Sequence, residues 1–462
     1  MLIPNKANIY RAIGISCIFV VALSIRLIPT HQEIVRDGFG QFGDTYLYLA
    51  IAHNLYKGNG FSGTLEESKN APAKEYKPTA TRGPGYPFFI FCVYKLLGNE
   101  KDMISPLTWH LIWDKVRIVQ FVMDSSLCFV VYAMGCAFFP KSFWPAIMSA
   151  VLYCFSVYNI YYAKALLSES LLTFLITISL GSVIMGITHS QKRWWIGAGT
   201  GFGLAILTRP EYILFVPVLA VYIFIVYRKT ISKAIIASLC LVMSAFLVIV
   251  PWSIRNYICF KDFIIVSTGG VGINLFTGTF ESNDNWKGWG NYPDSIYKNA
   301  EEKKLIQKLG SDYKHYYYNG NIKIKGVDLS FSKIALARIK QDPIKIIDLW
   351  IQKIPRLWYQ NYIQMYVLKE PSGYFFDFYF IFALVGFFYD SGKREKTIMM
   401  PVVLLFLYLN CIFLPLHVEP RYGVSVMPGL ICLTGVGIWK AFNLFFGKRY
   451  IVNTTSLSSE SS

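Results

Sequence analysis

Residues 43–62 read GDTYLYLAIAHNLYKGNGFS and follow the first hydrophobic run of the chain. The apolar residues from Tyr46 to Leu55 predict a short interfacial helix, and Gly58, Asn59 and Gly60 predict its end. Asp44 places an acid where a membrane helix meets water. A carboxylate at that boundary can meet both a lipid-borne group and a water-soluble one. We therefore expect the rest of the chain to be arranged around this stretch.

Composition indicates a polytopic membrane protein. The 462 residues are 54% hydrophobic, and only 16% are charged. Several apolar runs approach the ~20 residues that a helix needs to span a bilayer. The 45 Lys and Arg residues against 28 Asp and Glu residues give a net charge of +17. Because the basic residues are divided between short loops and one long loop, anionic lipid headgroups or a phosphate-bearing substrate are favoured as partners over nucleic acid.

The hydropathy pattern predicts about ten spanning helices. The first, 9–28, is long, contains Arg26 near its exit and is followed by no small-residue cleavage site, so a retained anchor is favoured over a signal peptide. The run 84–97 is too short, because a spanning helix needs ~17 to 25 residues. The other expected spans are 115–139, 143–163, 170–188, 193–209, 211–227, 234–251, 374–390, 397–415 and 422–443.

The distribution of Lys and Arg predicts the sidedness of the loops. If 84–97 does not span, most basic residues of the short loops lie on the cytoplasmic side, as the positive-inside rule requires. We therefore predict that 84–97 is a half-inserted helix within a long first external loop, 29–114. An amphipathic stretch at 343–362 is expected on the membrane surface. The chain then divides into a membrane module at 1–251, a small external domain at 252–373, C-terminal spanning helices at 374–446 and a cytoplasmic tail at 447–462.

This topology gathers polar side chains at the outer interface. Taken singly, each can be a charge at a helix end that reaches the headgroups, and this interpretation is favoured for Lys164 and Glu211. Taken together they suggest a phosphate site, because the arginine fork matches phosphate oxygens. The residues are Asp44, Arg82, Lys164, Glu169, Arg209, Glu211, Arg255, Asn256, Glu419, Arg421 and Tyr422.

Other motifs point to packing more than to chemistry. GAGTGFG at 197–203 mimics a dinucleotide fingerprint, but no strand precedes it, so it predicts close helix packing. TGGVGINLFTG at 268–278 either offers backbone amides to an anion or forms a glycine-rich turn. Asp124 is interpreted as a buried network residue. The six histidines show no ligand spacing, so a divalent cation stays possible without an assigned ligand, and the nine cysteines form no CxxC pair.

Taken in order, these segments resemble the polytopic glycosyltransferases of the C-type fold. The similarity is greatest to the bacterial branch related to protein O-mannosyltransferases and to the lipid A aminoarabinose transferase. It runs from about residue 9 to 278 and returns near 419–428, whereas 280–370 carries little of it. The segments that carry it are GDTYLYLAIAHNLYKGNGFS, TRGPGYPFFIF, YYAKALLSESLLTFLI, LTRPEYILFVP, PWSIRNYICFKDFIIVSTGGVGINLFTG and EPRYGVSVMP.

The resemblance implies an all-α membrane enzyme that takes a sugar from a polyprenyl-phosphate carrier. Asp44 matches the catalytic acid of the first external loop, and Glu169 matches a supporting acid of the second. Arg82 and Arg421 match basic residues expected near the donor phosphate. Two departures affect the placing of Arg82: Gly83 replaces a usual proline, and 66–77 looks like an insertion. The other substrate-binding candidates are Tyr86, Lys164, Arg255, Asn256 and Tyr422.

The expected reaction is inverting transfer of the sugar to an acceptor hydroxyl or phosphate on the outer face of the membrane, with Asp44 as general base. The expected location is a bacterial cell membrane, with the site facing the periplasm or the exterior. A transporter or flippase of lipid-linked sugars, or a polysaccharide polymerase or ligase, remains an alternative. The sequence identifies neither the sugar nor the acceptor, which could be protein Ser/Thr, lipid A, a cell-wall glycan or a lipid-linked saccharide.

Overall fold

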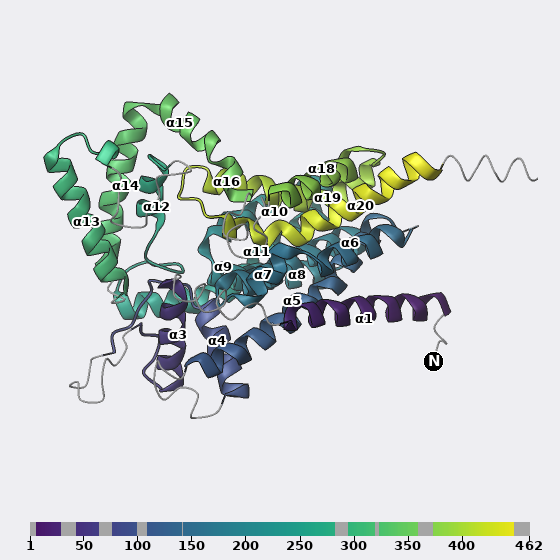
Figure 1. The fold of residues 1–462 in the computed structure, drawn as a ribbon, viewed down its shortest axis with the longest axis horizontal. Helices are drawn as coiled ribbons and strands as arrows, with labels where there is room; N and C mark the ends of the chain where they lie inside the picture. The colour runs from purple at the N-terminus through teal and green to yellow at the C-terminus, as the bar shows by residue number, and fades with distance from the viewer. Residues whose placement is uncertain are drawn as a thin grey trace, which may run out of the picture.

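The computed structural model describes residues 6–28, 43–63, 76–98, 109–140, 142–281, 294–318, 323–358 and 373–447. Within these ranges the chain is helical and contains no β-strand, which confirms the all-α prediction. One set of helices forms an elongated bundle, and a second set gathers at one end of it (Figure 1). Most of the predicted insertion 66–77, parts of the first external loop and the predicted tail lie outside the described ranges.

The helices of the bundle come from three parts of the chain. They are α1 (Lys6–Leu27), α5 (Trp109–Phe138), α6 (Trp144–Cys154), α7 (Val157–Lys164), α8 (Ser168–His189), α9 (Lys192–Thr208), η3 (Pro210–Leu214), α10 (Phe215–Val226), α11 (Ile231–Phe260), α18 (Gly373–Phe388), α19 (Lys393–Phe413), η6 (Pro420–Val426), α20 (Met427–Phe442) and η7 (Asn443–Gly447). The helices at the end are α3 (Gly43–Tyr56), α4 (Gly85–Leu97), α12 (Val271–Gly278), η4 (Asp294–Ile296), α13 (Ala300–Tyr318), α14 (Ile324–Gln341), α15 (Pro343–Gln352) and α16 (Ile354–Trp358).

All ten predicted spans are helical, although the number of complete spans is approximate. Among the described residues, six helices are long and apolar enough to cross a membrane, and α6 with α7 forms a pair bent by 45° that would make a seventh. The predicted spans 193–209, 211–227 and 374–390 correspond to shorter helices. The predicted boundary at 251 falls inside α11, which continues through Pro251 to Phe260.

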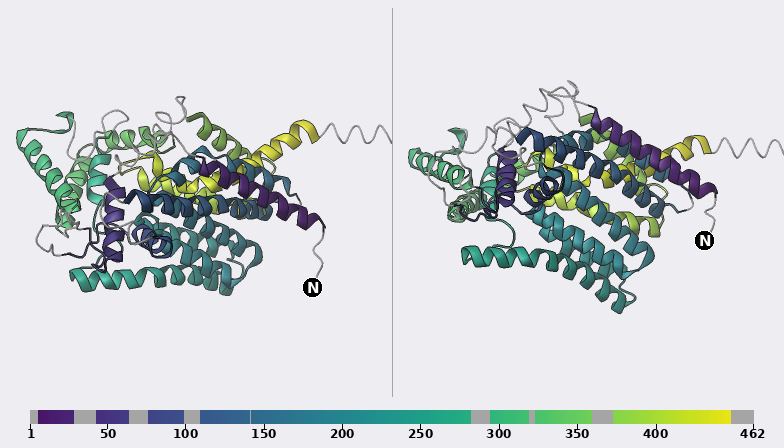
Figure 2. Two further views of the ribbon diagram at one scale, coloured as in Figure 1. Left: turned by 60° about the horizontal axis from the view of Figure 1, so that its bottom comes forward. Right: turned by 90° about the horizontal axis from the view of Figure 1, so that it is seen from below.

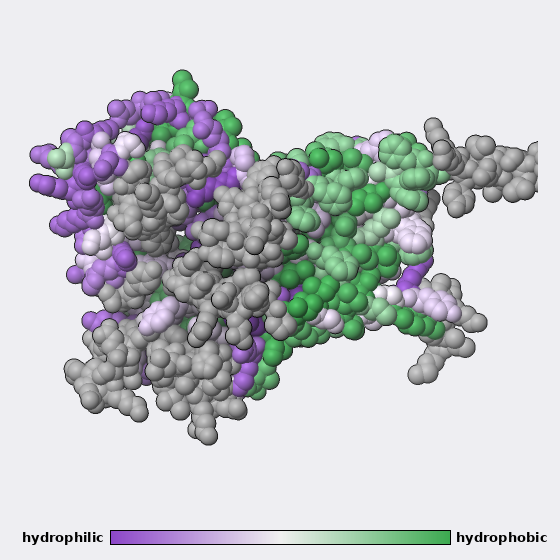
Figure 3. Space-filling model, in the orientation of Figure 1, coloured by the Kyte–Doolittle hydropathy of each residue, from purple (hydrophilic) through white to green (hydrophobic). Residues whose placement is uncertain are grey.

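The two parts of the molecule differ in surface chemistry. Hydrophobic residues cover the bundle, and hydrophilic residues gather over the end that carries α13 to α15 (Figure 3). Large apolar side chains such as Leu247 and Ile258 of α11 are more than 60% exposed. An apolar surface of this extent fits lipid tails better than water. Two further views show that the helices of residues 294–341 lie together at one end of the bundle (Figure 2).

Small residues and a buried ion pair hold the bundle together. A side-chain carbon at Gly199 would lie 2.1 Å from the carbonyl oxygen of Leu241 in α11, so α9 packs directly on α11 and the packing interpretation of GAGTGFG is confirmed. Arg26 of α1 is fully buried, and its Nε donates to Asp124 Oδ2 at 2.5 Å. Asp124 also accepts a hydrogen bond from Tyr153 at 2.7 Å. Asp124 is therefore a buried network residue that ties α1 to α5 and α6.

Helix α3 lies between the bundle and the polar end. Its residues 47–52 are all buried. Tyr48 belongs to an apolar cluster with residues of α4 and α5, and Ile51 belongs to another with residues of α11 to α14. A helix that is apolar all round is normally buried. The predicted helix is confirmed, and it packs against protein on both of these sides.

The turn after α3 brings a second segment of the chain beside the start of this helix. Gly58 and Gly60 have φ angles of +80° and +75°, which residues with a side chain rarely adopt. The Asn54 side chain donates to the carbonyl oxygen of Ser62 at 2.7 Å and closes the turn. The backbone N–H of Thr79 then donates to the carbonyl oxygen of Phe61 at 3.0 Å. This pairing directs the segment that follows Thr79 toward the N-terminus of α3.

Candidate active site

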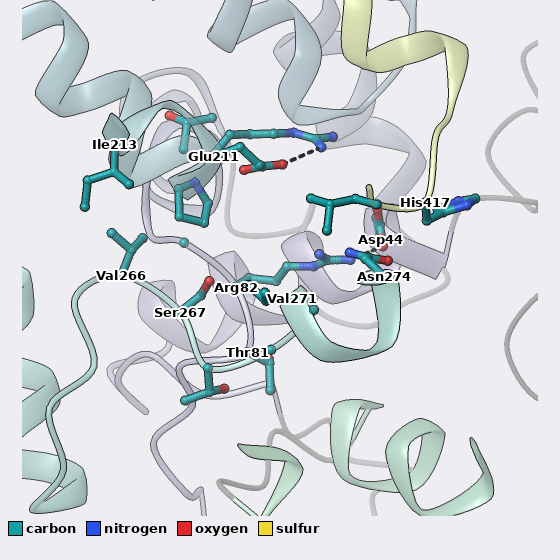
Figure 4. A pocket seen from close by; sticks show the side chains of 18 of the residues that line it. Asp44, Thr81, Arg82, Glu211, Ile213, Val266, Ser267, Val271, Asn274 and His417 are labelled. Carbon is teal, nitrogen blue, oxygen red and sulfur yellow. Dashed lines mark hydrogen bonds and ion pairs between the residues drawn. The ribbon is translucent and has the colours of Figure 1, made fainter. Parts of the chain in front are cut away.

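A cavity of about 1020 Å³ lies where the bundle meets the polar helices (Figure 4). Its lining is charged in one part and apolar in another, a combination typical of ligand sites. The charged residues are Asp44, Arg82, Arg209, Glu211, Lys314, Lys325, Glu419 and Arg421, with His417 beside them. The apolar residues include Ile213, Leu214, Phe263, Ile265, Val266, Ile412, Phe413 and Leu416.

Asp44 stands in the charged part of the cavity, on the first turn of α3. One carboxylate oxygen forms an ion pair with Arg82, which points toward it in Figure 4, and the other lies 3.3 Å from Nη1 of Arg421. Tyr317 of α13 donates its hydroxyl proton to Oδ1 at 3.3 Å. Burial opposes ionisation, but Arg82, Arg421 and Arg209 outweigh it and hold the pKa of Asp44 well below its ordinary value. The carboxylate is therefore ionised at neutral pH.

Arg421 bridges three carboxylates from different parts of the chain. Besides Asp44, its Nε lies 2.5 Å from Glu419 Oε2 and 3.5 Å from Glu169 Oε1. Glu169 lies in the first turn of α8, is only 2% exposed and sits behind the cavity wall without lining it. The structure thus brings together Asp44, Glu169, Arg82 and Arg421, four residues that the sequence assigns to one site.

Arg209 is the third guanidinium of the cluster. It forms an ion pair with Glu169, its Nε donates to Ser168 Oγ at 3.1 Å, and its Nη1 lies 3.4 Å from Glu211 Oε1. Its guanidinium also lies over the Tyr422 ring at 5.2 Å, and Tyr422 lines the cavity. Each of these arginines already has at least one carboxylate partner, so an incoming anion would share a guanidinium with a carboxylate.

Two predicted substrate-binding residues support the cavity wall without lining it. Arg255 donates from Nη1 to the carbonyl oxygen of Thr79 at 2.8 Å and from Nη2 to that of Phe61 at 3.3 Å. Asn256 donates to the carbonyl oxygens of Ile264 and Val266 at 3.1 and 3.2 Å. Both side chains point at backbone carbonyls because the loops on either side fold back over the end of α11. Neither side chain lines the cavity, so neither is placed to contact a phosphate bound there.

Two more predicted residues lie away from the cavity. Tyr86 is fully buried, and its hydroxyl donates to Gln120 at 2.7 Å. Lys164 donates to the carbonyl oxygen of Ile28 at 3.0 Å, at the end of α1. Lys164 therefore joins the end of α7 to the end of α1, and Tyr86 packs α4 against α5.

The sequence interpretation missed several contributors to the site. The sequence analysis placed Arg209 and Glu419 among the polar residues of the outer interface but assigned neither of them a role in the site. No sequence pattern pointed to Tyr317 or His417. Tyr317 lies in a run of tyrosines in the part without family resemblance, and no spacing links His417 to another potential metal ligand. Their positions depend on how α13 and the loop before η6 fold over the cavity.

The glycine-rich motif and the possible metal site can be examined directly. The backbone N–H groups of Gly272 and Ile273 donate to Asp328 at 2.9 and 3.0 Å. A side chain of α14 thus occupies these amides at the start of α12, which favours the structural interpretation of the motif. Within the described ranges, no group of three or more His, Cys, Asp or Glu side chains is arranged to hold a metal ion.

Comparison with known proteins places this arrangement in a fold family. Residues 82–254 match the family model described as dolichyl-phosphate-mannose-protein mannosyltransferase. No curated protein matches the sequence. The oligosaccharyltransferase AglB from Archaeoglobus fulgidus, solved with an inhibitory peptide and a dolichol-phosphate, is similar over 96% of this chain and 52% of its own, with a TM-score of 0.54 and 10% identity. The chain has the C-type glycosyltransferase fold.

Other structures show how far the similarity extends. A complex of the Archaeoglobus fulgidus oligosaccharyltransferase with Zn and sulfate gives a TM-score of 0.53 and 11% identity over 96% of this chain and 51% of that one. ArnT from Cupriavidus metallidurans in the apo state gives a TM-score of 0.37 and 13% identity, over 94% and 77% of the two chains. The chain spans about half the length of the archaeal oligosaccharyltransferases to which it is similar. It is an integral membrane protein whose fold is similar to that of the archaeal oligosaccharyltransferase.

Proposed function

We propose that this protein is an inverting glycosyltransferase that moves a sugar from a polyprenyl-phosphate carrier to an acceptor hydroxyl or phosphate on the outer face of the membrane. The observation that carries the proposal is the position of Asp44 among Arg82, Arg209 and Arg421, in a cavity that also has an apolar wall. An anionic head joined to a long apolar chain would match both parts of that cavity.

The apolar wall offers a path for the isoprenoid. Phe263 and Ile265 line the cavity and lie just beyond the end of α11. The last turns of α11 expose Ile254 and Ile258, which lie on the apolar surface of the bundle. An isoprenoid lying along this surface would leave its phosphate at the charged part of the cavity, where arginine forks match phosphate oxygens.

The expected chemistry is a single displacement at the anomeric carbon. The acceptor oxygen attacks this carbon from the face opposite phosphate, its proton passes to Asp44, and the bond from the anomeric carbon to the phosphate oxygen breaks. Polyprenyl phosphate leaves with the bonding electrons, and Arg82 and Arg421 stabilise the charge that develops on it. Because the phosphate competes with Asp44 for these two arginines, donor binding would also raise the basicity of the carboxylate.

The proposal is tested with purified full-length protein and a radiolabelled polyprenyl-phosphate sugar. Separate reactions contain a Ser/Thr peptide, lipid A or a lipid-linked saccharide as acceptor. Release of polyprenyl phosphate together with label on one acceptor would support transfer. In sealed vesicles, movement of intact donor across the bilayer without release of polyprenyl phosphate would instead indicate a transporter and would contradict the proposal.

Tyr317→Phe is expected to reduce turnover moderately. The substitution keeps the ring that lies 4.8 Å from the Arg82 guanidinium but removes the hydroxyl that donates to Asp44 at 3.3 Å. Because this hydrogen bond is long, we expect its removal to cost no more than loss of an ordinary hydrogen bond, about 0.5–1.5 kcal/mol. This corresponds to a roughly 2- to 13-fold lower kcat, with little change in KM for the donor. Steady-state kinetics measure both constants.

The matched control is Tyr316→Phe, one position earlier in the same helix and outside the cavity lining. It removes the same hydroxyl from α13 without removing a contact to Asp44. Equal kcat values for the wild type and Tyr317→Phe would show that the hydroxyl does not orient the carboxylate during turnover.

A further inference from the structure

A continuous chain of charged side chains, buried at its centre, runs from α16 to the arginine beside Asp44. Arg356 Nη1 lies 2.7 Å from Glu281 Oε1, and the Glu281 carboxylate lies 2.9 and 3.0 Å from Nδ1 of His417. On the other side of the ring, Nε2 of His417 lies 3.1 Å from Glu419 Oε1. The second oxygen of Glu419 lies 2.5 Å from Nε of Arg421. The path therefore connects Arg356 of α16 to the charged part of the cavity without a gap.

The surroundings of His417 favour the imidazolium form. A neutral imidazole donates from only one nitrogen, so it would direct a lone pair at one of the two carboxylates. Burial lowers the pKa of His417, but its hydrogen bonds to Glu281 and Glu419 outweigh burial and raise the pKa above the ordinary value of 6.5. In the same way, burial opposes the ionisation of Glu419, but Arg421 and His417 lower its pKa to about 2.

The loop that carries His417 is also held by bonds that do not involve the imidazole. The backbone N–H of His417 donates to the carbonyl oxygen of Asn274 at 2.9 Å. Lys353 Nζ donates to the carbonyl oxygens of Leu416 and Gly278 at 2.9 and 3.3 Å. A substitution that changes only the imidazole can therefore leave the backbone of this loop in place and alter the positions of the Glu419 and Arg421 side chains.

We propose that His417 is a positioning residue for the transfer reaction: as an imidazolium held by Glu281, it fixes Glu419, which in turn fixes the Arg421 guanidinium beside Asp44 and the donor phosphate. The inference rests on the proposed function. If His417 loses its proton, Glu419 keeps Arg421 as its main partner and draws the guanidinium away from the phosphate position. Donor binding then weakens.

This role predicts a dependence on pH with a defined sign. A histidine whose pKa is raised in the folded protein is charged below that pKa and loses its proton as the pH rises through it. The kcat/KM for the donor should therefore fall on the alkaline side, above pH 6.5. The charged groups packed around His417 that set this transition are Glu281, Lys353, Arg356, Glu419 and Arg421.

The experiment compares His417→Gln, Glu281→Gln and the control His315→Gln across pH in the full-length protein. His417→Gln should raise KM for the donor roughly 10- to 100-fold, as expected for loss of a charge-assisted hydrogen bond, and should remove the alkaline transition. Glu281→Gln removes a negative charge beside the imidazole, so it should move the transition to lower pH. His315→Gln, on an exposed position of α13, should leave the profile unchanged.

Failure of this inference can be separated from failure of the proposed function. Binding of a polyprenyl phosphodiester, whose charge is constant over this pH range, needs no turnover and should weaken at alkaline pH in the wild type. An unchanged KM and pH profile in His417→Gln would overturn the role of His417. If His417→Gln does not fold, a transition that stays in place in Glu281→Gln would overturn it equally. Absence of sugar transfer by the wild type, with pH-dependent binding intact, would contradict only the proposed reaction.

Discussion

Asp44→Asn is expected to abolish sugar transfer and leave the protein folded. The amide has nearly the same shape as the carboxylate and keeps an oxygen that can accept from Tyr317. It cannot take the proton of the acceptor, and loss of a general base costs about 10²- to 10⁴-fold in rate. The rate is measured as release of polyprenyl phosphate from labelled donor, and folding is checked by thermal unfolding of the purified protein.

Donor binding provides an internal check on this variant. Arg82 and Arg421 both contact Asp44, so they lose a competing negative charge in Asp44→Asn. The affinity for polyprenyl phosphate should therefore be maintained or increased while turnover is lost. Asp294 is an exposed carboxylate paired with Lys303, so Asp294→Asn is the matched control and should retain wild-type activity. Full turnover in Asp44→Asn would end its assignment as the base.

The sequence predicted the grouping of the site because that grouping depends on topology. Apolar runs define the helices, and the distribution of Lys and Arg places alternate helix ends on one side. Asp44, Glu169 and Arg421 all follow or precede such runs on the same side, and the structure joins them through one guanidinium. The family resemblance pointed to the same residues from the order of their motifs.

The roles of individual arginines could not be read from the sequence in the same way. Arg209 ends one predicted span and Arg255 follows another, both on the predicted outer side, yet Arg209 lies against Glu169 and Arg255 donates hydrogen bonds to loop carbonyls. The difference arises from the direction of each side chain, which helix boundaries do not determine. Tyr317 and His417 reach the cavity through contacts between α13, α12 and the loop before η6, and no local pattern encodes those contacts.

Substitution of Arg421 should cause the second large loss. It contacts Asp44, Glu169 and Glu419 together, which the compact ammonium of Lys cannot do. Arg421→Ala should reduce kcat roughly 10²- to 10³-fold, about 2.7–4 kcal/mol, by analogy with removal of one donor to a developing oxyanion. Arg421→Lys should lose much of this activity although the charge is kept. Single-turnover measurements at saturating donor separate this effect from weaker binding.

Arg255→Lys is the informative control, because the sequence places both arginines at the same interface whereas the structure separates them. Arg255 donates hydrogen bonds to the carbonyl oxygens of Thr79 and Phe61 and does not line the cavity. Its substitution should lower thermal stability and leave kcat close to the wild-type value. Arg421→Lys should show the opposite pattern, with the rate lost and most of the stability kept. Equal losses of rate in the two variants would contradict the assignment of this cavity as the donor phosphate site.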